Sequence, residues 1–393
     1  MGAKFKFALA ATVAVVAIST AYFVFRWTSP DAEFSRGLNY VSGEGVSQDY
    51  AKAVYWWQKA AAQGYAKAQF DLGVLYHNGW GGAQDDTKAA YWTQKAADQG
   101  NVDAEVGLGS LYYNGQGVPL GATEADSISK PYYNGMGVLQ DNTKAAYWFQ
   151  KASDQGDATA EDALGGLYYN GQGVSQDYAK AAYWYQKAAD QGNADAEDNL
   201  GNLYIVGQGV SQDYAKAAYW TQKAADQGDV NAEDDLGNLY DTGNGEPEDL
   251  TKAAYWYQKA ADQGDVDAEV DLGNLYNDQN EGSGTTVAEQ AVKDDTKAAF
   301  WYQKAVAQGD SLAEDALGGL YATGQGVPLD QVKAYMLLDL AVSHEPQGLN
   351  LSGDRDRVAS TMTPDEIAAA QKLASEAPSQ AEKPACLNWR LQN

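Results

Sequence analysis

The sequence predicts an all-α protein, an α/α solenoid (superhelix) of about eight 36-residue helix-turn-helix repeats. The main evidence for this fold is the block Lys-Ala-Ala-Tyr-Trp. The block or a close variant of it begins at Lys52, Lys88, Lys144, Lys180, Lys216, Lys252, Lys297 and Lys333. Successive starts are separated by 36, 56, 36, 36, 36, 45 and 36 residues. A period of roughly 20 to 50 residues is typical of units that bury their apolar faces only by stacking on one another.

Residues 177–192 predict the first helix of a unit, because apolar side chains recur at helical spacing at Ala181, Trp184, Tyr185, Ala188 and Ala189. Asp177 suits the N-cap, and Gly192 suits the left-handed position after the last turn. Residues 194–204 repeat the helical spacing and predict a second, antiparallel helix. Small residues let the two backbones approach closely, and we expect Trp184 and Tyr204 to supply most of the buried area.

These units resemble a known family. The pattern A-x-x-W-Y-x-K-A-A-x-x-G, followed by L-G-x-L-Y-x-x-G-x-G-V, is similar to the Sel-one-like repeat, a relative of the tetratricopeptide repeat. The resemblance extends from Phe34 to Ala341 and implies an α/α superhelix that serves as a scaffold for protein partners. Some relatives are cysteine-rich and were linked to β-lactam hydrolysis. Cys386 is the single cysteine here and lies outside the repeats, so that activity does not transfer.

Departures from the period predict the ends and the insertions. Residues 34–46 match only the second half of a unit, as expected for a first cap. A unit near residues 117–132 has lost its first helix, and the segment after Tyr276 is a protruding loop. We expect residues 1–30 to be a signal-anchor or signal peptide, residues 31–345 the solenoid, residues 346–377 C-terminal capping helices, and residues 378–393 a disordered tail. Thr363, Pro364 and Glu366 form a capping-box signature within the closing segment.

The N-terminus carries a localisation signal. Lys4 and Lys6 precede an uncharged apolar run over residues 7–25, and Arg26 follows it. A membrane span needs about 20 apolar residues, whereas the apolar core of a signal peptide has roughly 7 to 15. Length favours a retained anchor, but small-x-small cleavage sites at residues 17–21 keep a secretory signal open. Either alternative places the repeats outside the cytoplasm of a bacterial cell, inner-membrane-anchored or in the periplasm.

Charge excludes one class of partner. The chain carries a net charge of −27, and residues 1–30 contribute +3, which leaves −30 for the rest. Nucleic acid is not expected as a ligand, because it requires a clustered Lys/Arg surface. Much of the negative charge lies in the second helices, in the pairs Glu161-Asp162, Glu197-Asp198, Glu233-Asp234 and Glu314-Asp315. We expect this acidic ladder to be a solvated face; the alternative is a docking surface for a basic partner or divalent cations.

Signals for catalysis or metal binding are sparse. The two histidines, His77 and His344, are isolated, which disfavours a His-based triad or a zinc site. A calcium-loop template fits only partly, since Ser283 replaces its required glycine; the matching positions are Asp278, Asn280, Gly282 and Glu289. The sequence therefore predicts no catalytic residue, no metal site and no cofactor.

A second face of the first helices is the candidate partner-binding site. Opposite the apolar stripe, a tyrosine and a glutamine recur at i and i+3, as Tyr147 and Gln150, Tyr183 and Gln186, Tyr219 and Gln222, and Tyr255 and Gln258. In tetratricopeptide-like folds the first helices line the concave surface. By that resemblance, this Tyr-Gln ladder would hold an extended peptide by stacking and amide contacts. The alternative is that each tyrosine packs against the next first helix.

The sequence thus favours a non-enzymatic protein-interaction scaffold of the bacterial cell envelope that binds a protein or peptide and contacts the membrane through residues 7–25 if these are not cleaved. An envelope hydrolase and a cation-responsive structural protein are the alternatives from other classes.

Overall fold

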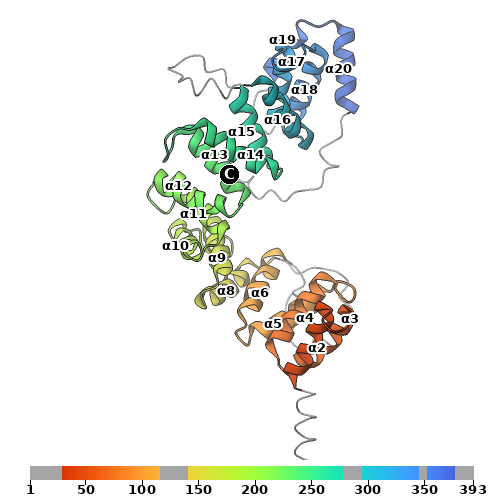
Figure 1. The fold of residues 1–393 in the computed structure, drawn as a ribbon, viewed down its shortest axis with the longest axis vertical. Helices are drawn as coiled ribbons and strands as arrows, with labels where there is room; N and C mark the ends of the chain where they lie inside the picture. The colour runs from red at the N-terminus through yellow and green to blue at the C-terminus, as the bar shows by residue number, and fades with distance from the viewer. Residues whose placement is uncertain (1–28, 116–139, 278–293, 345–351, 377–393) are drawn as a thin grey trace, which may run out of the picture. The chain divides into compact units, whose positions relative to one another are not determined.

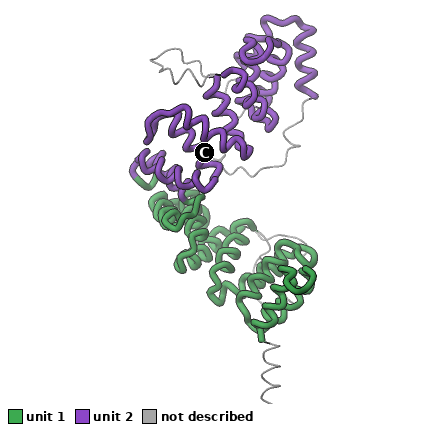
Figure 2. The backbone as a smooth tube through the Cα atoms, in the orientation of Figure 1, with its two compact units in different colours: residues 1–196, 208–210 green, residues 197–207, 211–393 purple. Residues whose placement is uncertain are grey.

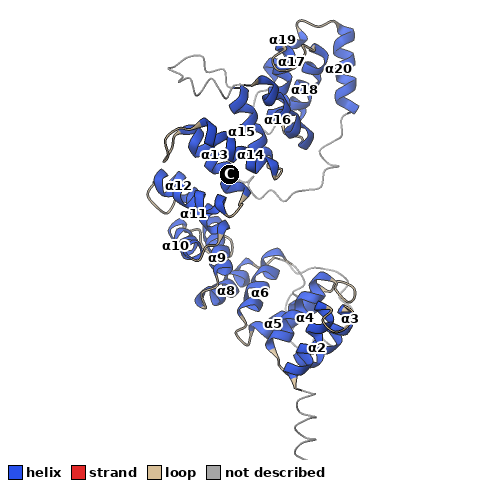
Figure 3. Cartoon of the chain, in the orientation of Figure 1, coloured by secondary structure: helices blue, strands red, loops and turns tan. Residues whose placement is uncertain are grey.

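The computed structural model describes residues 29–115, 140–277, 294–344 and 352–376. Within these ranges every regular element is a helix (Figures 1 and 3). The helices are α2 (Pro30–Ser42), α3 (Tyr50–Ala62), α4 (Ala66–Asn78), α5 (Asp86–Ala97), α6 (Val102–Asn114), α8 (Asn142–Asp154), α9 (Ala158–Asn170), α10 (Tyr178–Asp190), α11 (Ala194–Val206), α12 (Tyr214–Asp226), α13 (Val230–Thr242), α14 (Leu250–Asp262), α15 (Val266–Asn277), α16 (Asp295–Gln308), α17 (Ser311–Thr323), α18 (Gln331–His344), α19 (Ser352–Ala359) and α20 (Pro364–Glu376).

The chain divides into two compact units (Figure 2). Unit 1 contains residues 1–196 and 208–210, and unit 2 contains residues 197–207 and 211–393. In unit 1 the elements from α2 to α10 alternate between second and first helices. The same alternation runs from α12 to α18 in unit 2. The predicted all-α repeat solenoid is confirmed.

Aspartate caps begin the first helices. Asp177 Oδ1 accepts a hydrogen bond from the backbone N–H of Lys180 at 3.0 Å, and the Lys180 ammonium lies 3.6 Å from Asp177 Oδ2. Each such cap stabilises a helix by about 1 kcal/mol. The same arrangement recurs at Asp49, Asp85, Asp141, Asp213, Asp249, Asp294 and Asp330. The predicted N-cap role of Asp177 is confirmed, and Gly192 has the expected positive φ of 83°.

Each second helix packs closely on the first helix of the following repeat, and a glycine makes the contact possible. A Cβ at Gly165 of α9 would lie 2.6 Å from Tyr185 Cδ1 of α10, and a Cβ at Gly237 of α13 would lie 2.5 Å from Tyr257 Cδ1 of α14. The buried tyrosine occupies the space above the glycine. Tyr185 is only 4% exposed, and Trp184 and Tyr204 are half-buried, so Tyr185 is the aromatic residue that fills this contact. That Trp184 and Tyr204 supply most of the buried area stays a prediction.

The two insertions leave this stacking intact. We call the contact between a second helix and the following first helix a joint. In a regular joint, the Asp177 N–H donates to the Tyr168 carbonyl at 2.9 Å. Across the longer intervals, Asp141 N–H donates to the Tyr112 carbonyl at 3.0 Å, and Asp294 N–H donates to the Tyr276 carbonyl at 2.9 Å. The described residues that flank both insertions are therefore joined in the same way as those that flank a short turn. The predicted loss of a first helix and the predicted protruding loop fall on residues 116–139 and 278–293, outside the described residues.

The first described helix, α2, has a polar outer face. Two leucines that are buried in later second helices, such as Leu164 and Leu167, correspond to Arg36 and Asn39 in α2. Arg36 is half-buried with its guanidinium 4.7 Å from the Trp56 ring, and Asn39 is exposed. Helix α2 therefore carries polar residues at the two positions where other second helices bury leucines, as repeat-protein caps do.

The C-terminal end is closed by α19 and α20. Thr363 and Glu366 form the predicted capping box, since the Thr363 N–H donates to Glu366 Oε2 at 2.8 Å and the Glu366 N–H donates to Thr363 Oγ1 at 3.3 Å. No helix in the described ranges has the length and apolar character required of a bilayer span. The predicted anchor at residues 7–25 and the predicted disordered tail lie outside those ranges.

Candidate partner-binding surface

The candidate surface consists of one aromatic side chain that remains exposed in six of the eight described first helices; the exceptions are α5, where Tyr91 is half-buried, and α18, which has Met336. In unit 1, Tyr147 and Tyr183 are 55% and 57% exposed; in unit 2, Tyr219 and Tyr255 are 58% and 57% exposed. Tyr55 and Phe300 occupy the same position and are 51% and 53% exposed. We call these residues the aromatic ladder. The alternative that each tyrosine packs against the next first helix is wrong.

Neighbouring side chains hold the ladder residues in place. The Tyr183 ring meets the Trp184 ring edge-on with centroids 5.0 Å apart, and the Lys187 ammonium lies 4.8 Å from the Trp184 centroid. Gln186 Nε2 donates to Asp190 Oδ1 at 2.9 Å one turn further along the helix. The predicted Tyr-Gln ladder thus presents aromatic rings beside ordered amides. The same Gln–Asp bond recurs at Gln150, Gln222 and Gln258.

The predicted solvated acidic ladder is wrong for its glutamates and also for Asp198 and Asp234, which are buried. Glu161 and Glu197 are 0% exposed, Glu233 is 1% exposed and Glu314 is 2% exposed. The first turn of each second helix directs its glutamate toward the following first helix, where a lysine and a glutamine meet it. A buried carboxylate is tolerated only when charge and hydrogen bonds compensate it.

The joint between α9 and α10 shows this compensation. Glu161 Oε1 lies 2.5 Å from Lys187 Nζ, and Gln191 Nε2 donates to Glu161 Oε2 at 2.6 Å. Lys187 therefore contacts both the buried joint and the aromatic ladder. Equivalent trios join α13 to α14, α15 to α16 and α6 to α8: Glu233, Lys259 and Gln263; Glu269, Lys304 and Gln308; Glu105, Lys151 and Gln155. Burial raises the pKa of the Glu105 carboxyl, whose lysine is the most distant at 3.9 Å.

Two joints have other residues at positions of the trio. Between α4 and α5 the glutamate is replaced by Gln69, which accepts a hydrogen bond from Gln99 Nε2 at 2.7 Å. Between α17 and α18, Leu340 stands where other joints have lysine, and His344 takes the place of glutamine. His344 Nδ1 lies 3.0 Å from Glu314 Oε2. His344 was expected to be isolated, but its contact is 30 residues away and follows the spacing of the other joints.

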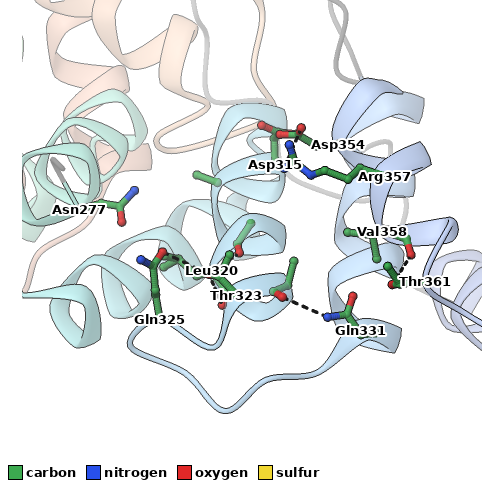
Figure 4. Close-up of a pocket in the computed structure, with 13 residues that line it drawn as sticks. Asn277, Asp315, Leu320, Thr323, Gln325, Gln331, Asp354, Arg357, Val358 and Thr361 are labelled. Atoms are coloured by element: carbon green, nitrogen blue, oxygen red, sulfur yellow. Dashed lines mark hydrogen bonds and ion pairs between the residues drawn. The ribbon is translucent and has the colours of Figure 1, made fainter. Parts of the chain in front are cut away.

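A cavity of about 450 Å³ lies between α17, α18 and α19 (Figure 4). Asp315, Asp354 and Arg357 line one side of it, and Thr323, Gln325 and Gln331 line another. Arg357 pairs with Asp354 at 3.0 Å. Burial, assisted by the charge of Asp354, raises the pKa of Asp315. The lining lacks a nucleophile held against a base, so it does not resemble a catalytic site.

Metal and histidine chemistry add no further site. Within the described ranges, no three His, Cys, Asp or Glu residues are grouped so as to hold a metal ion. His77 Nδ1 lies 2.9 Å from Asp86 Oδ1, which also accepts a hydrogen bond from Gln84 Nε2 at 3.3 Å. The partial calcium-loop match and Cys386 lie outside the described residues.

The regular joints, capped helices and glycine contacts agree with a family profile. The Sel1 repeat, the repeat that the sequence resembles, matches residues 30–65, 66–101, 102–125, 132–157, 158–193, 194–229, 230–265, 267–310 and 311–344. The chain belongs to the Sel1 repeat family. Sel1 repeat proteins generally mediate protein–protein interaction and are generally non-catalytic scaffolds.

Solved Sel1 repeat structures are similar over most of the chain. A Sel1 repeat protein from Oxalobacter formigenes is 29% identical with a TM-score of 0.59, and the match covers 85% of this chain and 86% of that one. A protective antigen of uropathogenic Escherichia coli with an SLR fold is 28% identical with a TM-score of 0.56, covering 88% of this chain and 83% of that one. No curated protein matches the chain.

Proposed function

We propose that this Sel1 repeat protein is a non-enzymatic scaffold that binds a protein or peptide partner on the aromatic ladder. The observation that supports it most directly is the exposure of Tyr147, Tyr183, Tyr219 and Tyr255, each above 50%, at a position that is aromatic and exposed in six of the eight described first helices. Stacking does not require these rings, because Tyr185 and Tyr257 already fill the joints. Exposed tyrosines offer large contact area at low rotamer entropy, which is why they are enriched in interfaces.

The ladder suits an extended segment better than a single small ligand. Within each unit its tyrosines are one repeat apart along the chain, and each has a glutamine one turn away. Side-chain amides can bond to a peptide backbone whatever the peptide's sequence, while aromatic rings take up its side chains.

Photo-crosslinking tests the surface in intact cells. Benzoylphenylalanine replaces Tyr183 or Tyr219, and the matched controls carry it at Val206 or Leu329, which are 61% and 63% exposed and lie off the ladder. We expect the ladder positions to crosslink to the same partner and the controls not to. Equal crosslinking from Val206 and Leu329 would move the binding surface away from the first helices.

We also propose that the repeats lie outside the cytoplasm, in a bacterial cell envelope. The proposal is supported by Lys4 and Lys6 before the apolar run of residues 7–25. Protease added to spheroplasts should digest the repeats, and salt washing should not release them from the membrane if the run is retained. Protection in intact spheroplasts would overturn this localisation, and a chain that starts near Thr20 or Tyr22 would identify a signal peptide instead.

A further inference from the structure

In two repeats the turn after the second helix packs a valine against the core of its own repeat. The turn sequence G-x-G-V places Val174 against the cluster that α8 and α9 share, and Val327 against the cluster that α16 and α17 share. The valine is held there because the preceding glycine approaches the start of the first helix very closely. A Cβ at Gly173 would lie 2.1 Å from the carbonyl carbon of Asn142.

The repeat formed by α12 and α13 has Glu246 in place of this valine, and a cavity of about 290 Å³ opens there. Buried apolar groups form much of its lining: Ala218 is 4% exposed, Leu236 is 1% exposed and Tyr240 is 7% exposed. Tyr219 and Gln222 of the Tyr-Gln ladder also line it, together with Ala215, Lys223 and Glu246. The cavity is therefore continuous with the proposed binding surface.

One carboxylate beside the cavity, that of Glu246, has no ion-pair partner among the described residues. The Lys223 ammonium contacts Glu197 and lies 4.5 Å from the Trp220 ring centroid. Lys252, whose ammonium lies 4.6 Å from the Tyr240 ring, is 4.0 Å from Asp249. Glu246 is half-buried, and no ion pair within the described residues involves it. An apolar occupant would bury this carboxylate without compensation, which is unfavourable.

We propose that this cavity binds one lysine or arginine side chain of the partner, with its cation on the Glu246 carboxylate. The inference rests on the proposed function and names the chemistry that the ladder recognises. The aliphatic stem of the basic side chain packs on Ala215, Ala218 and Leu236, as long basic side chains do on apolar surfaces. A volume near the lower end of ligand pockets, roughly 300 Å³, suits a single long side chain.

The test is a titration of the full chain observed through its alanine methyl groups by NMR. The probes are Nα-acetyl-arginine methylamide and Nα-acetyl-norleucine methylamide, which share an aliphatic stem and differ in charge. We expect the arginine probe to shift the Ala215 and Ala218 signals saturably, and the norleucine probe to bind about tenfold more weakly because it lacks the charged hydrogen bond. Ala146 and Ala299, at the position of Ala218 in repeats closed by Val174 and Val327, should not respond.

Two variants separate charge from volume. Glu246→Val introduces the residue that other repeats carry, so it should fold, and it should abolish the arginine response. Glu246→Gln keeps the size and should weaken binding about tenfold. Equal response to both probes, an unchanged response in Glu246→Val, or no shift of Ala215 and Ala218 in the wild type would overturn the proposal. Circular dichroism melting confirms that both variants are folded.

The outcome also distinguishes this inference from the proposed function. Tyr219 crosslinks that persist unchanged in Glu246→Val would overturn the basic anchor and leave the scaffold standing. Arginine-probe binding without any crosslink from Tyr183 or Tyr219 would overturn the scaffold alone.

Discussion

In α10 and α14, two tyrosines that are two residues apart have opposite roles. Tyr185 is 4% exposed and lies over Gly165, and burial raises the pKa of its phenol well above the usual value. Tyr183 is 57% exposed and contacts chiefly its own helix neighbour, Trp184. Tyr185 therefore contributes to stability, and Tyr183 is free to contribute to binding.

Truncation of the two tyrosines should separate these roles. Tyr185→Ala empties the joint between α9 and α10 and should lower the free energy of unfolding by about 3 to 5 kcal/mol. Tyr183→Ala removes an exposed ring and should change it by less than about 1 kcal/mol. Urea unfolding followed by circular dichroism gives both values. A Tyr183→Ala loss as large as that of Tyr185→Ala would show that the ladder is structural.

A second prediction at the scale of residues concerns the buried contact between Glu161 and Lys187. Lys187→Met leaves Glu161 buried without its cation and should destabilise the chain by about 3 to 5 kcal/mol. Glu161→Gln should cost less, because Lys187 keeps 38% of its side chain in water and because Gln69 and Gln99 already form an uncharged joint in this chain. Combining the two changes should recover part of the Lys187→Met loss. Strictly additive losses in this double-mutant cycle would contradict the coupling.

At the scale of helices, local signals made most elements predictable. Asp177 marks the start of α10, Gly192 follows its end, and the capping box of Thr363 and Glu366 begins α20. The orientation of the acidic pairs was not predictable, because a carboxylate in the first turn of a helix usually faces water. Glu161 is buried by Lys187 and Gln191, which lie 26 and 30 residues away, and a local reading cannot detect that contact.

The polar face of α2 should be necessary for solubility. Arg36→Leu with Asn39→Leu restores the leucines of other second helices and creates an exposed apolar stripe, which should cause self-association. Light scattering should detect it as a rise in mean mass at concentrations where the wild type is unaffected. The control, Ser35→Leu with Glu44→Leu, adds two leucines at exposed, separated positions. Association of both variants to the same degree would contradict a specific role for the polar face.

At the scale of the whole molecule, the period predicted the solenoid, and the insertions did not disturb it, because Asp141 and Asp294 reproduce the backbone bonds of regular turns. The cavity beside Glu246 was not predicted. A single valine-to-glutamate difference carries that signal, and its meaning depends on Val174 and Val327 being packed in the core.

Two half-buried carboxyls, those of Asp71 and Asp271, should make the chain more stable as the pH falls from 7 toward 5. Burial raises the pKa of Asp71 to about 6, assisted by Asp103 and opposed by Lys67; burial likewise raises the pKa of Asp271 to about 6, assisted by Asp267. At a pH between the ordinary pKa of an aspartate and 6, the folded chain binds these two protons more tightly than the unfolded chain does. The stability that the two protons contribute is therefore lost as the pH rises through 6.

Melting temperatures measured from pH 5 to pH 7.5 at constant ionic strength test this dependence. Asp71→Asn with Asp271→Asn should flatten the profile, while Asp190→Asn, at an exposed position, should leave it unchanged. A profile that is equally steep in the Asp71 and Asp271 double variant would contradict the assignment to these two carboxyls.

The most direct test of the central claim is the affinity of the crosslinked partner for ladder variants of the intact chain. Tyr183→Ala with Tyr219→Ala should weaken binding at least about 30-fold, as expected when interface hot spots are removed, and Gln186→Ala with Gln222→Ala should weaken it by a smaller factor. Both variants should melt within a few degrees of the wild type. Unchanged affinity in folded Tyr and Gln variants, together with lost affinity when exposed acidic residues of the second helices are reversed in charge, would contradict the claim and place the partner on the other face.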